Sequence, residues 1–185
     1  MIWISVPLLF LAPITPHGDP ACITSASAAS LAKRSSPLDS VSFEVGSARV
    51  KICYGRPSAR GRSMIGGYNV PFGKLWRTGA NEPTMLHTSG PITVAGVHLE
   101  AGTYSLYTIP DKEQWTIIFN RSTTQWGDEG SYSETVKKEE VGRGMAPVKP
   151  LESHVEQFTI RPELKGGWGA LVLEWEKTRV TVALK

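Results

Sequence analysis

The chain has 185 residues, of which 41% are hydrophobic and 20% are charged, and its formal net charge is +3. This length and composition fit one folded domain with a leader and exclude a disordered or fibrous chain. A positive charge this small, without a dense basic face or a known module, predicts no nucleic-acid partner.

The N-terminus has the features of an export leader. Residues from Ile2 to Leu11 are nearly all apolar, but the run is far shorter than the roughly 20 residues of a membrane span. No stable membrane span is therefore expected. Small residues follow, with an A-x-A pattern that ends at Ala28. We predict a signal peptide or leader over residues 1–28 and export to the periplasm or beyond. The alternative is a buried N-terminal segment, because no Lys or Arg precedes Ile2.

The two cysteines lie on either side of this cleavage site. Cys22 could carry a lipid anchor, but Asp19-Pro20-Ala21 lacks the apolar and small residues of such a site, so we favour lipid attachment less. Removal of residues 1–28 leaves Cys53 alone, which predicts no internal disulfide. Cys53 lies in an alternating apolar run and is expected to be a small, half-buried side chain instead of a nucleophile.

The body of the chain has the pattern of an all-β protein. Residues 29–39 predict a linker, and residues 40–185 predict a single domain. Val41, Phe43 and Val45 alternate with polar residues, and after Gly46-Ser47 the run 49–54 alternates again. This is typical of a β-hairpin.

Beyond the hairpin, a long irregular segment from 55 to 83 is rich in Gly, Pro and Arg. Loops of this length are usually functional or disordered. A short helix is expected at 133–141, with Glu134 and Lys138 spaced for an ion pair. Further strands are expected at 84–88, 92–94, 97–99, 102–109, 115–119, 155–161, 169–176 and 178–184. The strand at 115–119 is apolar on both faces, which predicts a central position. We predict an antiparallel β-sandwich or a partly open barrel with one long loop.

No motif predicts a metal or a cofactor. The histidines have no metal-ligand spacing, and His17 lies in the predicted leader. The segment 61–65 lacks the second glycine of a nucleophile elbow. Gly73-Lys74 is followed by Leu75 instead of Ser or Thr, which excludes a phosphate-binding loop.

The long loop carries the strongest functional signal, a local excess of positive charge. No Asp or Glu interrupts its cations until Glu82. Because the arginine fork pairs with carboxylate or phosphate, we predict an anionic ligand. The alternative is that these side chains are solvated or bridge to acids on neighbouring strands. The cations are Arg49, Lys51, Arg56, Arg60, Arg62, Lys74 and Arg77.

Residues 76–82 place an aromatic ring, a cation, an amide and a carboxylate close together. On the functional interpretation, Arg77 holds an anion, Asn81 orients a polar group, and Glu82 is the catalytic acid or base or holds Arg77. On the structural interpretation, Trp76 plugs the end of the sandwich, Arg77 pairs with Glu82, and Asn81 caps the turn. Trp126, in a predicted turn, is a candidate for stacking on a sugar, whereas Trp115 follows a strand period and is expected in the core.

Several segments together resemble one known family. They are Arg56-Pro57-Ser58, Gly61-Arg62, 71–74, 76–82, 101–106, 108–110, 115–120 and Gln125-Trp126-Gly127. In this order, over about residues 36–184, they resemble the domain of unknown function 2911 family. The resemblance implies an exported, β-rich bacterial domain and no established activity. Residues 142–145 depart from the more apolar strand of the family, which leaves the pairing of that strand open.

Three functions follow as hypotheses. The leading one is a module that binds a small anionic or glycan ligand through Arg56, Arg62, Trp76, Arg77, Asn81 and Trp126. The second is a hydrolase or isomerase in which Glu82 is the catalytic residue and Arg77 stabilises charge. The third is a structural envelope domain without a small ligand.

Overall fold

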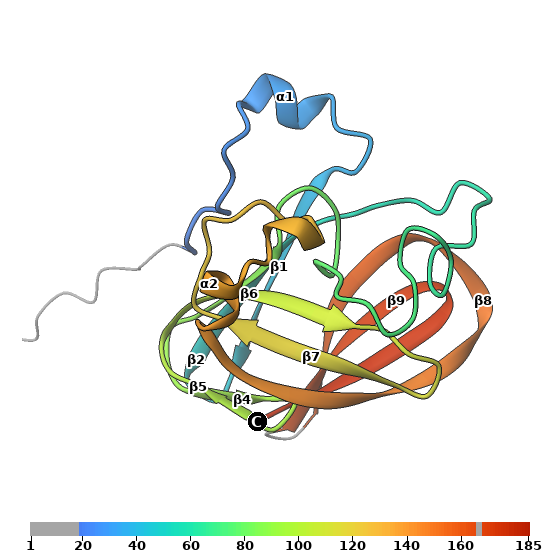
Figure 1. The fold of residues 1–185 in the computed structure, drawn as a ribbon. Helices are drawn as coiled ribbons and strands as arrows, with labels where there is room; N and C mark the ends of the chain where they lie inside the picture. The colour runs from blue at the N-terminus through green and yellow to red at the C-terminus, as the bar shows by residue number, and fades with distance from the viewer. Residues whose placement is uncertain (1–18, 166–167) are drawn as a thin grey trace, which may run out of the picture.

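A computed structural model describes residues 19–165 and 168–185 as an all-β fold (Figure 1). The strands form one antiparallel sheet in the order β1-β2-β3-β6-β7-β8-β9-β4-β5, and its ends are not joined into a barrel. The elements are α1 (Ala28–Ala32), β1 (Leu38–Val45), β2 (Ala48–Gly55), β3 (Thr84–Thr88), β4 (Ile92–Val94), β5 (Val97–Leu99), β6 (Gly102–Ile109), β7 (Gln114–Asn120), η1 (Glu129–Ser131), α2 (Glu134–Lys137), β8 (Glu140–Lys165) and β9 (Trp168–Leu184).

The first seven strands confirm the sequence prediction. β1 and β2 form the expected hairpin, with Val45 opposite Ala48. β7 is central, because it pairs with β6 on one side and β8 on the other. Trp115, Ile117 and Ile118 are all at most 1% exposed, so both faces of this strand are covered.

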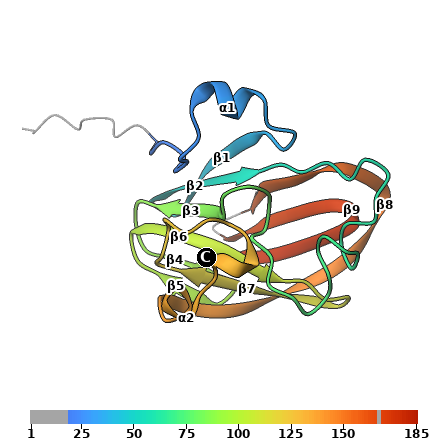
Figure 2. The ribbon, with the colours of Figure 1, turned by 45° about the horizontal axis from the view of Figure 1, so that its top comes forward.

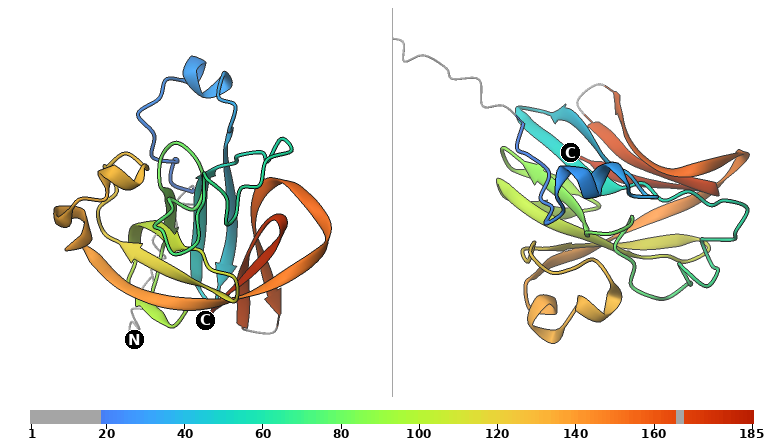
Figure 3. Two further views of the ribbon diagram at one scale, coloured as in Figure 1. Left: turned by 45° about the vertical axis from the view of Figure 1, so that its right-hand side comes forward. Right: turned by 90° about the horizontal axis from the view of Figure 1, so that it is seen from above.

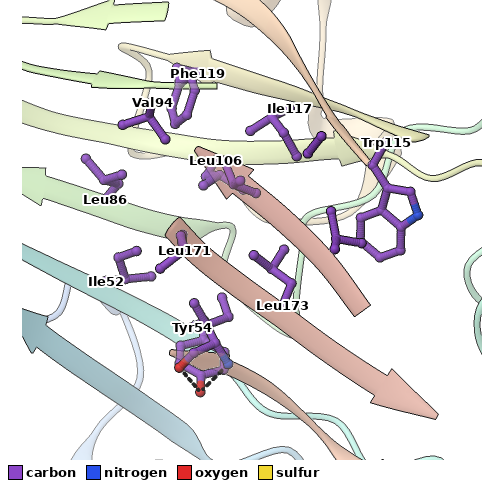
Figure 4. Close-up of a cluster of buried hydrophobic side chains, with 14 of the residues drawn as sticks. Ile52, Tyr54, Leu86, Val94, Leu106, Trp115, Ile117, Phe119, Leu171 and Leu173 are labelled. Atoms are coloured by element: carbon purple, nitrogen blue, oxygen red, sulfur yellow. Dashed lines mark hydrogen bonds between the residues drawn. The ribbon is translucent and has the colours of Figure 1, made fainter. Parts of the chain in front are cut away.

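The sheet folds over so that one face is the core. Apolar side chains from β2, β3, β6 and β7 meet those of β9, including Leu171 and Leu173 (Figure 4). Tyr54 joins the two halves, since its hydroxyl donates to Ile160 O at 3.4 Å and accepts from Ile160 N at 3.0 Å. Burial of this apolar surface is the main stabilising contribution to the fold.

Two segments cover parts of the opposite face. Between β7 and β8, Tyr132 packs edge-on against Tyr107 at 4.7 Å between ring centroids. At the other end, the N-terminal segment is bonded to the sheet through a Cys22–Cys53 disulfide. The prediction of no disulfide applies to a chain cut after Ala28, whereas in the uncut chain Cys53 is paired with Cys22. The two Cα atoms lie 5.7 Å apart because an extended segment before α1 runs past β2, and cleavage after Ala28 would remove this bond.

The C-terminal half differs from the prediction in its strand lengths. Two long strands, β8 and β9, stand where three short ones were expected, and β8 is curved along its length (Figures 1 and 2). β9 continues through Glu176, which has a φ of 53°, so the expected turn is a local irregularity within a strand.

β8 also begins earlier than expected, at Glu140. The predicted helix is reduced to the four residues of α2, and Glu134 pairs with Lys137 at 3.6 Å instead of Lys138. At Gly144 in β8, the β4–β5 hairpin packs closely against the backbone. A Cβ there would be 2.0 Å from Ala95 O, which explains the glycine at this position. In the described part of the chain, no helix is long and apolar enough to cross a bilayer.

Candidate functional site

The loop between β2 and β3 is fixed by side chains, and Arg56 is its first anchor. Its guanidinium donates to Phe158 O at 3.1 Å and Thr159 Oγ1 at 3.0 Å, and it pairs with Asp39 at 3.0 Å. These partners come from β8 and β1. With these partners, Arg56 ties the start of the loop across two distant strands.

Arg62 and Glu176 fix the next part of the loop. Arg62 folds back on the chain and donates to Ala59 O and Ser58 O, each at 3.0 Å. The Glu176 carboxylate accepts from Met64 N and from Ile65 N, the latter at 2.8 Å. A carboxylate from β9 thereby satisfies two backbone donors of a segment without regular structure.

Trp76 anchors the far end of the loop. Its backbone forms a bridge with Thr108 in β6, and its side chain is 4% exposed. The ring stacks on Trp175 at 5.9 Å and meets Phe158 edge-on at 5.1 Å. Trp76 therefore plugs the end of the folded sheet, as the structural interpretation predicted. Gly55 permits the close packing there, because a Cβ at that position would lie 2.1 Å from Ala80 O.

Arg77 follows Trp76 and has fewer strong contacts than Arg56. Its guanidinium donates to Asn81 O at 3.1 Å and lies 3.9 Å from the half-exposed carboxylate of Glu129. The side chain is 19% exposed. Arg77 is thus held in place by one backbone carbonyl, while its acidic neighbour lies at the limit of an ion pair.

Glu82 lies in a different environment from Arg77. Its carboxylate accepts two hydrogen bonds from Arg34, at 2.6 and 2.8 Å, and one from Thr24 at 2.6 Å. Burial raises the pKa of the Glu82 carboxyl, but these hydrogen bonds more than offset burial, and the pKa lies below its usual value. The ion pair between Arg77 and Glu82 that the structural interpretation expected is absent, because Glu82 pairs with Arg34 instead. A carboxylate held ionised in this way does not favour catalysis by Glu82.

A cavity of about 450 Å³ opens between the loop and Trp175 of β9. Three of the predicted site residues, Trp76, Arg77 and Asn81, line it. Arg56, Arg62, Glu82 and Trp126 are not among the described residues that line it. The lining is completed by Pro57, Met64, Tyr68, Asn69, Val70, Gly79, Ala80, Glu129 and Trp175.

Four lining residues that bear on recognition were not predicted. Tyr68 and Asn69 lie within the long loop, where no periodic pattern distinguishes them. Tyr68 is 97% exposed at the cavity. Trp175 lies at an inward-facing position in the alternation of β9, which predicts a core side chain. The pattern gives no sign that Trp175 also lines the cavity. Glu129 belongs to a separate segment, which reaches the loop where Gly127 packs against Asn81 and Glu82 and where Glu129 approaches Arg77.

Trp126 is 45% exposed, which is compatible with a surface contact. It neighbours Gly127 and therefore lies beside the 81–83 segment, close in the chain to Glu129. The structure thus separates the predicted residues into a cavity group of three and four others with structural partners or surface positions.

Comparison with known proteins gives one match. The model of the family described as Protein of unknown function (DUF2911) matches residues 36–184. No curated protein and no solved structure matches the chain. The match covers the sheet and the long loop, and leaves out residues 19–35 and Lys185 of the described chain. The chain belongs to the DUF2911 family of proteins of unknown function.

Proposed function

We propose that this protein binds a small acidic sugar, or a similar hydroxylated carboxylate, in the cavity beside Arg77. The observation that carries the proposal is the convergence of Arg77, Asn69 and Asn81 on one cavity with aromatic walls. A guanidinium recognises a carboxylate with paired donors, and amide side chains both donate to and accept from hydroxyl groups.

The character of the cavity favours a single negative charge on the ligand. Arg77 is the one cation among the described lining residues, and Glu129 lies on the same cavity. A polyphosphate would meet too little positive charge. A monocarboxylate needs one cation, and its hydroxyl groups can use the two asparagines. Tyr68, at 97% exposure, offers a free aromatic face at the cavity.

Glu129 competes with such a ligand for Arg77. Its carboxylate lies 3.9 Å from the guanidinium and is 49% exposed, so it is weakly held. An incoming carboxylate would take the place of Glu129 beside Arg77. Removal of the Glu129 charge should then strengthen binding of an anion, by about threefold for charges separated in a largely aqueous setting.

The test is calorimetric titration with D-glucuronate, after a thermal-shift screen of small acids and acidic sugars. Glucuronate should stabilise the protein against heat because it binds only the folded state. Arg77→Ala should weaken binding by at least about tenfold, as expected for loss of a charge-assisted hydrogen bond. Glu129→Gln should strengthen binding.

Lys74→Ala is the matched control, since Lys74 is exposed in the same loop and its loss changes net charge by the same amount. Binding that falls equally in Lys74→Ala and Arg77→Ala would indicate attraction by net charge alone. Unchanged binding in Arg77→Ala would show that the ligand does not bind beside Arg77 in this cavity.

Export is part of the same proposal. The apolar run from Ile2 to Leu11 supports a leader, and a Cys22–Cys53 disulfide is favoured in an oxidising compartment outside the cytoplasm. Fractionation of cells that express the full chain, with N-terminal sequencing of the mature protein, tests this. We expect the protein in the periplasm or medium with Cys22 retained, which replaces the predicted cleavage after Ala28 with one before Cys22. A reduced protein in the cytoplasm would contradict export.

A further inference from the structure

The N-terminal segment from Asp19 to Pro37, here called the strap, is attached to the domain from outside the sheet (Figure 3). Nearly all of it precedes the family match, which begins at residue 36. It is fixed covalently at one end by the Cys22–Cys53 bond and leads directly into β1 at the other. The strap is therefore a segment almost entirely outside the family match, and one disulfide bond fixes it to the matched domain.

Between its two ends the strap is attached through Glu82. Thr24, two residues after Cys22, donates to Glu82 Oε1, and Arg34 donates to both carboxylate oxygens. The side chains of Arg34 and Glu82 are only 13% and 12% exposed. A two-point, largely buried contact of this kind holds its partner in one geometry.

The same contact continues into the wall of the cavity. Asn81, next to Glu82 in the chain, donates from its side chain to Ser36 O at 3.2 Å. Its own carbonyl accepts from Arg77 at 3.1 Å. Asn81 has a φ of 68°, in the left-handed region that asparagine adopts more readily than most other residues. The path therefore runs from the strap through Glu82 and Asn81 to the cation of the cavity.

We propose that the strap is a redox-sensitive clamp on the cavity. With the Cys22–Cys53 bond intact, it holds Asn81 and Glu82 in place. When the bond is reduced, the segment before α1 is released, Thr24 leaves Glu82, and the wall that carries Arg77 and Asn81 loosens. The predicted loss of ligand affinity rests on the proposed function, whereas the loosening of the wall does not.

The chemistry requires an external dithiol as reductant. One of its thiolates attacks a sulfur of the Cys22–Cys53 bond and forms a mixed disulfide, and its second thiolate then displaces the protein sulfur. The protein gains two electrons and two protons and ends with two thiols. The dithiol loses the same electrons and protons and becomes a disulfide.

Hydrogen exchange measured by mass spectrometry tests the clamp without any ligand. Addition of dithiothreitol to the full chain should speed amide exchange in residues 24–36 and 77–84 by about tenfold, as local opening does. Residues 114–120, in the centre of the sheet, should be unaffected. The Cys22→Ser/Cys53→Ser variant should exchange at the fast rate with or without dithiothreitol. Unchanged exchange in 77–84 upon reduction would overturn the proposal.

A second variant separates the clamp from the disulfide itself. Arg34→Ala keeps the covalent bond but removes the contact with Glu82, and it should speed exchange in 77–84 without any reductant. Lys33→Ala, an exposed neighbour on the strap, should leave exchange unchanged. Slow exchange in 77–84 of Arg34→Ala would show that the strap does not act through Glu82.

D-glucuronate titration of the oxidised and reduced chain tests the functional consequence. Reduction should weaken binding by about fivefold, as expected if the binding conformation becomes a minor population. Equal affinity in both states, with 77–84 loosened, would overturn control of binding. No binding even to the oxidised chain would reject glucuronate as the ligand of the proposed site, while the exchange experiment would still decide whether the clamp exists.

Discussion

The long loop at residues 56–83 and the β8–β9 hairpin are both long segments of the chain, but they are ordered by different means. β9 pairs with β8 over most of its own length, and the first part of β8 pairs with β7, so backbone hydrogen bonds fix both strands. The loop has isolated bridges, such as Trp76 with Thr108, and scattered backbone hydrogen bonds, such as Ala59 N to Glu156 O, and side chains supply further anchors. Arg56, Arg62 and Glu176 supply hydrogen bonds that a strand would obtain from its neighbour.

This difference explains the basic character of the loop. A guanidinium has five donors and can serve several carbonyls at once. Arg56 and Arg62 use theirs on backbone oxygens and on Asp39. A run of cations in a loop without regular structure therefore indicates anchoring as much as ligand binding. Arg77 differs because it lines a cavity.

The largest expected effect comes from Trp76→Ala. Trp76 is 4% exposed and packs against Trp175 and Phe158, so removal of its ring leaves a large void in the core. We expect the free energy of unfolding to fall by about 3–5 kcal/mol. Urea denaturation followed by circular dichroism measures this change. A loss below about 1 kcal/mol would mean that the loop does not depend on this plug.

Arg56→Ala should have the next largest effect. It removes three contacts from the start of the loop and leaves Phe158 O without this donor, which should lower the free energy of unfolding by about 2–3 kcal/mol. Lys74→Ala, which removes an exposed cation from the same loop, should change it by less than about 0.5 kcal/mol. Equal effects in the two variants would refute the anchoring role of Arg56.

Glu82→Gln should have a smaller, pH-dependent effect. The pKa of folded Glu82 lies below its ordinary value of 4.5, so the folded state binds a proton less readily than the unfolded state. The stability that this carboxylate contributes is complete above about pH 5 and is lost as the pH falls through the folded pKa. We expect Glu82→Gln to cost about 1–2 kcal/mol at neutral pH.

The difference between wild type and Glu82→Gln should therefore shrink as the pH is lowered toward 3 in urea denaturation. A difference that grows with acid would contradict the ion pair with Arg34. Asp111→Asn, which removes an exposed carboxylate from the turn after β6, serves as the control.

Trp126→Ala should have the smallest effect on stability. The side chain is 45% exposed, and we expect a change of less than about 1 kcal/mol in the free energy of unfolding. Since Trp126 is not among the described residues that line the cavity, glucuronate affinity should also be unchanged. A tenfold loss of affinity in Trp126→Ala would extend the site to the segment around Glu129.

The sequence predicted the strands up to Asn120 well, because their apolar alternation is a local signal. The first half of β8 was missed, since Gly142 and Gly144 show no alternation. Their place is set by the β4–β5 hairpin, whose Val97 and Ala95 lie where a side chain would be. The Cys22–Cys53 bond was missed because Cys22 was assigned to a leader that was expected to be removed.

The candidate site was predicted only in part, for a related reason. The loop and the 76–82 segment stood out by length and residue type, and three of the seven predicted residues line the cavity. The partners of the others are remote in sequence: Glu82 pairs with Arg34, 48 residues away, and Arg56 reaches Phe158, 102 residues away. The sequence alone cannot show which cations are already bonded to partners this far away in the chain.

The most direct test of the binding site is a titration of D-glucuronate followed by the indole N–H signals of the tryptophans in NMR spectra. Signals would be assigned by single Trp→Phe variants. Binding in the cavity should shift the indole signals of Trp76 and Trp175, which line it, and leave Trp126 unchanged. Shifts confined to Trp126, with Trp76 and Trp175 unmoved at saturation, would place the ligand elsewhere and contradict the role of the cavity.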